Sequence, residues 1–109
     1  MKQVDVLGTT YSIHEADMMT DQALEQCDGY CDETVKVCVI DSMKNRTDPM
    51  SKQDIQKYKN QVVRHELVHA FLFESGLGND SWAANEEIVD WIAAMFPKLK
   101  DAFEQLKVG

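Results

Sequence analysis

The chain has 109 residues, of which 44% are hydrophobic and 28% are charged, and its formal net charge is -8. We expect one soluble domain spanning residues 1–109, with a small but adequate core. The negative charge, which no block of Lys or Arg offsets, disfavours binding to nucleic acid or to an anionic membrane surface. With no long apolar run and no basic-then-apolar N-terminus, the sequence predicts a cytoplasmic protein without a membrane span.

The N-terminal segment has the pattern of a β-hairpin followed by a short helix. Residues 4–7 and 11–13 alternate between apolar and polar side chains, and Gly8-Thr9-Thr10 separates them as a turn. Residues 18–26 have the composition of a short helix that Thr20 or Asp21 would cap.

The strongest strand pattern covers residues 34–41, where β-branched side chains alternate steadily. Tyr30 begins a short strand of its own, with a turn at Asp32-Glu33 between the two. The exposed edge of such a sheet can hold a peptide substrate in extended form through main-chain hydrogen bonds. Residues 42–49 are polar and end in Pro49, so we expect a loop over about residues 42–50.

The second half of the chain is predicted to be helical. A central helix begins near Ser51, with Ser51 and Asp54 in its first turn, and ends near Ser75 at the glycine-rich stretch 76–80. Ser81 or Asn85 caps the next helix, which is apolar almost all round until Pro97 interrupts it, a pattern that predicts burial against several elements.

A last amphipathic helix is expected from Pro97 to Leu106, with Leu99, Phe103 and Leu106 as its buried stripe.

The central helix contains the pentapeptide HELVH, residues 65–69. Residues four apart on an α-helix lie about 40° apart around the axis, so His65 and His69 can bind one metal ion. Glu66 lies beside them and can act as a general base on a metal-bound water, which is the logic of H-E-x-x-H in zinc peptidases.

The third ligand must come from elsewhere. The extended pattern of three histidines is excluded, because Leu72 and Ser75 occupy the positions of its glycine and third histidine. On the next helix Glu86 and Asp90 are four apart and share a face. We therefore assign Glu86 as the third metal ligand and Asp90 as the acceptor that orients a ligand histidine, with Glu87 as the alternative ligand.

HELVH followed by E-x-x-x-D on a second helix resembles the gluzincin arrangement of zinc metallopeptidases. The strands before the motif and EEIVDWIAAMF after it are similar to the compact ImmA/IrrE-type proteins of bacteria, their mobile elements and phages. The resemblance covers about residues 29–96. It aligns Glu86 with the family's ligand and puts Asp90 where Asn is common.

The resemblance implies a minimal zincin-like α+β domain, in which a small mixed sheet packs on the HExxH helix and a second helix carries a ligand. It also implies a Zn²⁺-dependent metallopeptidase that hydrolyses a peptide bond in a protein substrate. Larger gluzincins carry a downstream His or Tyr that stabilises the oxyanion. No histidine follows His69 here, and Tyr11, Tyr30 or Tyr58 are the candidate substitutes.

A second hypothesis keeps the same ligands in a non-catalytic zinc domain that binds a partner protein. A fourth protein ligand such as Cys27 or Cys31 would favour it. Three cysteines without a signal peptide indicate reduced thiols, and Cys38 has the pattern of an apolar strand residue. His14, outside the motif, is interpreted as a solvated surface residue rather than a transition-state hydrogen-bond donor.

Overall fold

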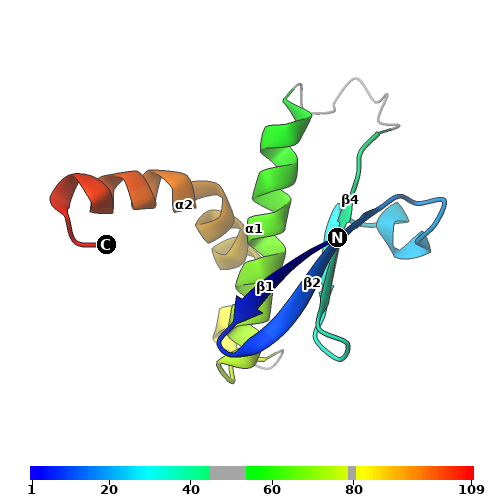
Figure 1. Ribbon diagram of the computed structural model, residues 1–109, viewed down its shortest axis with the longest axis horizontal. Coiled ribbons are helices and arrows are strands. Elements are labelled where there is room, and N and C mark those ends of the chain that lie inside the picture. The colour runs from blue at the N-terminus through cyan, green and yellow to red at the C-terminus, as the bar shows by residue number, and fades with distance from the viewer. Residues whose placement is uncertain (45–53, 79–80) are drawn as a thin grey trace.

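The computed structural model describes residues 1–44, 54–78 and 81–109. A four-stranded mixed sheet packs on a long helix, α1 (Ile55–Glu74), and a second helix, α2 (Glu86–Leu106), packs on the other side of α1 (Figure 1). The predicted α+β class is confirmed. Within the described residues no helix is both long enough and apolar enough to cross a membrane.

The predicted N-terminal hairpin is present. Strand β1 (Lys2–Val6) pairs antiparallel with β2 (Thr9–Ala16), and the tight turn between them uses Leu7 and Gly8, whose φ angles are 52° and 90°. Two consecutive positive φ angles match the twist of the flanking strands. Thr9 and Thr10, which the sequence placed in the turn, therefore belong to β2.

A second hairpin joins β3 (Gly29–Asp32) to β4 (Val37–Asp41). The predicted strand from residue 34 begins later, because the Asp32 side chain accepts hydrogen bonds from the Thr34 amide and hydroxyl and holds the chain in a turn. The helix expected over residues 18–26 is a short 3₁₀ turn, η1 (Gln22–Glu25), capped by Asp21.

The strand order is β1-β2-β4-β3, so the two hairpins meet through a parallel pairing of β2 with β4. Within the described sheet this order leaves β1 and β3 at the edges. One apolar cluster beneath the sheet contains Val6, Tyr11, Cys38 and Ala70. The other contains Ile40, Met43 and Val62, so both clusters join the strands to α1.

Helix α1 has well-defined ends. Asp54 caps its first turn by accepting from the Lys57 amide at 3.0 Å, while the predicted cap Ser51 and most of the predicted loop 42–50 lie outside the described residues. At the other end Gly76 has φ 90°, and the amides of Gly76 and Leu77 donate to Phe73 and Leu72 carbonyls. This is the glycine stop that the sequence predicted.

The end of α1 is also tied to the sheet. Glu74 accepts hydrogen bonds from the Tyr11 hydroxyl and the Lys36 ammonium, each at 2.8 Å. One turn from the helix start, Lys59 forms an ion pair with Glu15 of β2. These contacts fix α1 along the sheet at both ends, and the HELVH motif lies between them.

Helix α2 differs from the prediction. A short 3₁₀ turn, η2 (Trp82–Ala84), capped by Ser81 precedes it, and Asn85 caps α2 itself by accepting from the Glu87 amide at 2.8 Å. The helix then continues through Pro97 to Leu106, so the expected break and separate last helix are wrong. A proline removes the hydrogen bond to the carbonyl four residues earlier. Here that carbonyl, on Ala93, accepts from the Arg64 Nε of α1 at 2.7 Å.

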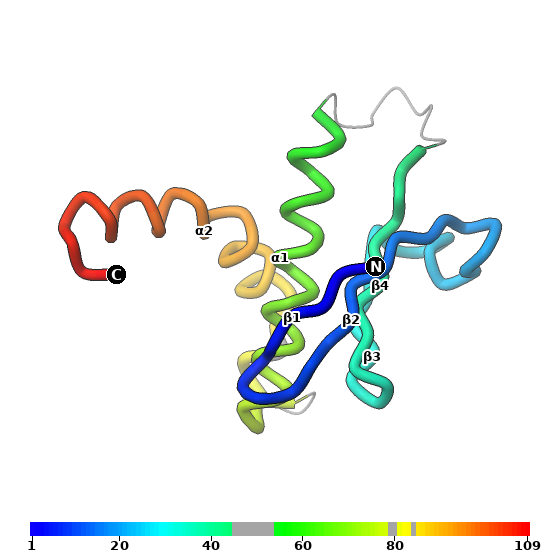
Figure 2. Tube along the Cα trace, viewed as in Figure 1, coloured from blue at the N-terminus to red at the C-terminus, as the bar shows by residue number. Residues whose placement is uncertain are grey.

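The predicted burial of α2 is also wrong. Only Val89 and Ala93 are buried in it, whereas Trp91, Phe96, Phe103 and Leu106 are exposed. The second half of α2 runs away from the rest of the molecule and ends far from the N-terminus (Figure 2). The stripe expected to be buried is therefore largely open.

Candidate metal centre

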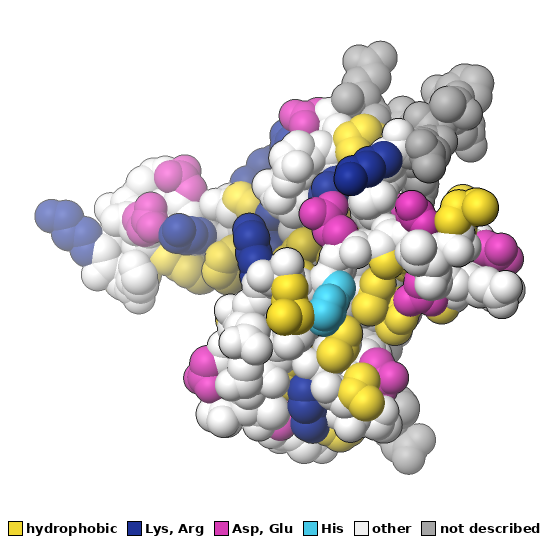
Figure 3. Space-filling view, turned by 45° about the vertical axis from the view of Figure 1, so that its right-hand side comes forward, with side chains coloured by type: hydrophobic (Ala, Val, Ile, Leu, Met, Phe, Trp, Pro, Cys, Tyr) yellow, Lys and Arg dark blue, Asp and Glu magenta, His cyan; other side chains and the backbone are white. Residues whose placement is uncertain are grey.

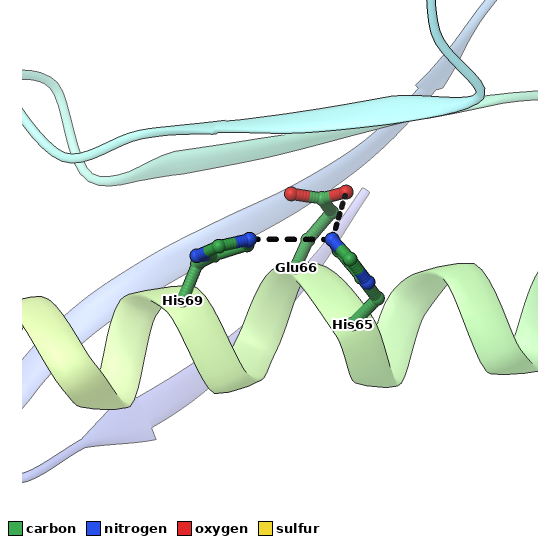
Figure 4. A group of neighbouring side chains, drawn as sticks. All are labelled: His65, Glu66 and His69. Atoms are coloured by element: carbon green, nitrogen blue, oxygen red, sulfur yellow. Dashed lines mark hydrogen bonds and ion pairs between the residues drawn. The ribbon is translucent and has the colours of Figure 1, made fainter. Parts of the chain in front are cut away.

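The HELVH residues lie on the side of α1 that faces the second hairpin. His65, Glu66 and His69 project from the helix toward the strands, and the two imidazoles point at one another (Figure 4). The Nε2 atoms of His65 and His69 are 3.2 Å apart, and a Glu66 carboxylate oxygen is 4.0 Å from the His65 Nε2. The helical spacing thus brings two nitrogens and a carboxylate into one group.

Glu86, at the start of α2, lies against both histidines. One of its carboxylate oxygens is 2.9 Å from the His65 Nε2 and the other is 2.8 Å from the His69 Nε2. Asn85, which caps the helix, fixes this first turn. Glu87 instead lines a separate cleft with Asp54 and Trp91, so the geometry favours Glu86 over the alternative ligand.

Asp90, one turn further along α2, contacts the other side of the same imidazole. Its Oδ1 is 2.6 Å from the His65 Nδ1. A carboxylate at Nδ1 holds the proton there and leaves Nε2 as the free acceptor nitrogen. The predicted pair at positions 86 and 90 therefore lies on the two nitrogens of His65.

These donor atoms fit a zinc ion. Tetrahedral zinc with Zn–N bonds of 2.0–2.1 Å places its ligand atoms about 3.3–3.4 Å apart. The separations of 2.8–3.2 Å among His65, His69 and Glu86 are close to that, and two groups of potential ligands meet here, His65 with Glu66 and His69, and His65 with Glu86 and Asp90. The donor set of two imidazoles and a carboxylate suits zinc.

Glu66 is buried, with 6% of its surface exposed. Burial raises the pKa of its carboxyl to about 7, with further raising by the negative charges of Glu86 and Asp90 and an opposing effect of His65. A carboxylate that titrates near neutral pH is suited to accept and release a proton.

A cleft of about 420 Å³ opens beside these residues. Strand β3 forms one wall through Gly29, Tyr30 and Cys31, and Leu72, Phe73 and Leu77 form an apolar end. Strand β3 is an edge strand of the described sheet, so a sheet edge lies next to the motif.

Gly29 allows this close arrangement. A Cβ atom at residue 29 would lie 2.9 Å from the Val62 Cγ1 and 3.0 Å from the Val39 carbonyl oxygen. Only a residue without a side chain lets β3 approach α1 this closely, one turn before His65. This role of Gly29 depends on the tertiary structure, so the sequence alone did not predict it.

The cysteines are free thiols, and among the described residues the groups that could hold a metal contain no cysteine. Cys27 and Cys31 line the cleft, but Cys31 pairs with Cys38 on β4, whose thiol hydrogen bond lowers the Cys31 pKa. His14 lies in β2 and lines a different cleft, with Lys59 and Arg64.

Two of the three tyrosines lie near the site. Tyr30 lines the cleft and donates to Asp21, and Tyr58 lines the adjoining cleft beside His65 and donates to Asp28. Tyr11 is fully buried in the core and donates to Glu74. Of the predicted oxyanion candidates, Tyr30 and Tyr58 therefore lie beside the site.

A scan against protein-family models, a search of curated proteins and a search of solved structures each give no match.

Proposed function

We propose that this chain is a zinc-dependent metallopeptidase in which His65, His69 and Glu86 hold Zn²⁺. The observation that carries the proposal is the meeting of three side chains from two helices: the Nε2 atoms of His65 and His69 are 3.2 Å apart, and each lies within 2.9 Å of one Glu86 carboxylate oxygen, beside a buried carboxylate. Asp90 orients His65 through its Nδ1.

When bound, zinc polarises the scissile carbonyl and lowers the pKa of water toward neutrality. Glu66 takes the proton of the attacking water and passes it to the leaving amine. Tyr30 and Tyr58 line the clefts beside the site, and either could donate to the developing oxyanion only after giving up its hydrogen bond to Asp21 or Asp28.

The substrate is a peptide segment in extended form. In the described sheet, the outer edge of β3 offers main-chain groups to such a segment, and the cleft beside it ends in the apolar side chains of Leu72, Phe73 and Leu77. An apolar substrate side chain near the scissile bond fits this end.

The likeness of HELVH and EEIVDWIA to gluzincins of the ImmA/IrrE type supports peptide hydrolysis over other reactions of bound zinc, and with it a role in bacteria, their mobile elements or phages. Free thiols at Cys27, Cys31 and Cys38 fit a reducing compartment, so we place the activity in the cytoplasm. A non-catalytic zinc domain would need a fourth protein ligand. Among the described residues no thiol joins the ligand groups, which favours the enzyme.

The test is metal content by mass spectrometry on untagged protein, for wild type, Glu86→Ala and Glu87→Ala. We expect one zinc per chain in wild type and in Glu87→Ala, and loss of zinc in Glu86→Ala. Glu87→Ala is the matched control, because it removes the neighbouring carboxylate from the same helical turn. Wild-type protein that holds no zinc even after reconstitution would overturn the proposal.

A further inference from the structure

An apolar groove of about 410 Å³ lies between α1 and α2, away from the metal centre. At 100° per residue, Leu67 and Phe71 project at least about 120° away from His65 and His69, whereas Leu72 lines both this groove and the cleft at the metal centre. The described lining is apolar except for two residues, and it comprises Leu7, Arg64, Leu67, Val68, Phe71, Leu72, Ser75, Ile92, Ala93 and Phe96.

An apolar stripe on α2 begins in this groove and continues beyond it. Ile92 and Phe96 line the groove, and Leu99, Phe103 and Leu106 follow at spacings of three and four residues, which keeps all five within about 80° around the helix. Phe103 is 46% exposed and Leu106 is 73% exposed. Hydrophobic side chains line the underside of the protruding helix in Figure 3.

The chain does not cover its own groove with this stripe. Helix α2 is continuous through Pro97, and the Arg64 contact to the Ala93 carbonyl holds it at the point where it leaves α1. The segment Pro97–Lys107, here called the tail, therefore points away from the body (Figure 1). Folding it back would break the helix.

We propose that the tail of one copy of this chain occupies the groove of a second copy, and that the exchange is reciprocal. The groove and the stripe have matching chemistry, and each is exposed in a single chain. A reciprocal exchange closes with two-fold symmetry, so it produces a dimer rather than a filament.

Charge also favours a second copy as the occupant. The tail carries Lys98, Lys100 and Lys107 against Asp101 and Glu104, a net charge of +1, in a chain of net charge -8. The rest of the chain therefore carries -9. A weakly basic tail that enters an acidic body reduces the repulsion between two acidic chains.

The exposed area is sufficient. Phe71, Phe96, Phe103 and Leu106 are between 42% and 73% exposed, and Leu7 at the groove is 60% exposed. With large apolar side chains of up to about 200 Å² each, two copies bury roughly 1,000 Å² in total, which is about the lower limit for a specific interface.

The experiment is sedimentation velocity on the full chain from low micromolar to about 100 µM. We expect wild type to shift from one chain to two. Phe103→Glu on the tail and Phe71→Glu in the groove should each weaken association at least about tenfold, since each buries a charge in the interface. Met19→Glu is the matched control, because Met19 is 84% exposed and lies outside both surfaces.

Mixing the two variants separates exchange from other pairings. A mixed dimer keeps one intact contact, between the tail of Phe71→Glu and the groove of Phe103→Glu, so mixing should restore part of the association. Circular dichroism checks folding, and Leu106→Glu replaces Phe103→Glu if that variant does not fold. Wild type that stays monomeric, or a dimer that Phe71→Glu leaves unchanged, would overturn the proposal.

Discussion

Helices α1 and α2 pack against each other, and the residues on the two sides of this helix–helix interface differ in chemistry. On one side Glu86 contacts both His65 and His69, and Asp90 contacts His65, all within 3.2 Å. On the other side Arg64 binds the Ala93 carbonyl, and the apolar residues around it line an open groove.

The difference shows how one pair of helices can carry two kinds of surface. On the polar side the groups of α1 find their partners within the same chain, because each imidazole nitrogen that faces α2 has a carboxylate beside it. On the apolar side the described residues do not cover the side chains in the same way, since Phe71 and Phe96 are more than 40% exposed. We expect substitutions on the polar side to change chemistry and those on the apolar side to change association.

The largest effect is expected from Glu66→Gln. Removing the general base should lower kcat by about 10²- to 10⁴-fold, while the zinc content stays that of wild type, because Glu66 is not a ligand. Peptide hydrolysis and metal content measured on the same preparation check this. Glu104→Gln, on the exposed tail, is the control. A Glu66→Gln variant that remains active would show that the mechanism is wrong.

The pH dependence of the free energy of unfolding should show how strongly burial raises the pKa of Glu66. In metal-free protein its pKa is about 7 in the folded state, above the value of 4.5 for an exposed glutamate, so the folded state binds the proton more tightly. The stability of wild type relative to Glu66→Gln should therefore be greatest below pH 4.5, fall by roughly 3 kcal/mol as pH rises to about 7, and then level off.

Denaturant unfolding of the two metal-free proteins at a series of pH values measures this difference. An identical pH profile for wild type and Glu66→Gln would mean that burial does not control the carboxyl.

Substitutions of Asp90 test its contact with His65, which joins α2 to α1 on the polar side. Asp90→Ala should weaken zinc affinity by about 10- to 100-fold, because the His65 ring loses the acceptor at its Nδ1. Asp90→Asn keeps an acceptor oxygen and should recover much of the affinity. Competition with a chelator of known affinity gives both values, and equal affinities for Asp90→Ala and wild type would exclude the orienting role.

Gly29 tests the approach of β3 to α1. Gly29→Ala should lower the free energy of unfolding by about 1–3 kcal/mol, since the added Cβ meets Val62 and the Val39 carbonyl. Gly78→Ala is the matched control, because a Cβ there would have nothing within 4 Å. Urea unfolding compares the two, and equal stabilities would contradict the close contact.

The smallest effect is expected on the apolar side. Leu106→Ser should change the free energy of unfolding by less than about 0.5 kcal/mol at a concentration where the chain is monomeric, because Leu106 is 73% exposed. Thermal unfolding at low concentration measures it. A large loss of stability would mean that the tail packs on its own chain.

Much of the candidate site could be predicted from the sequence, because its spacing is helical. Four-residue spacing aligned His65 with His69 and Glu86 with Asp90. The end of α1 at Gly76 followed from the lack of a side chain there, and Asn85 was one of the two caps expected for the next helix. The α+β class followed from the alternating strands and the helical second half.

The errors arose where a distant contact decided the local structure. Pro97 was expected to end a helix, but the carbonyl that it leaves free is bound by Arg64, on another helix. The spacing of Leu99, Phe103 and Leu106 showed that one face of this helix is apolar and would be stabilised by packing on another apolar surface. Hydrophobic periodicity identifies the apolar face of a helix but not the surface that covers it. The prediction that this face is buried within the same chain was therefore wrong.

The parallel pairing of β2 with β4 has a consequence for the order of folding. The two hairpins pair residues that are close in sequence, whereas the parallel pairing of Ile13 with Cys38 and the α1–α2 contact of His65 with Asp90 each join residues 25 apart. Local contacts form faster than distant ones. We therefore expect the two hairpins to form first, and the candidate ligands of α1 and α2 to meet later, on about the same timescale as the parallel pairing of the strands.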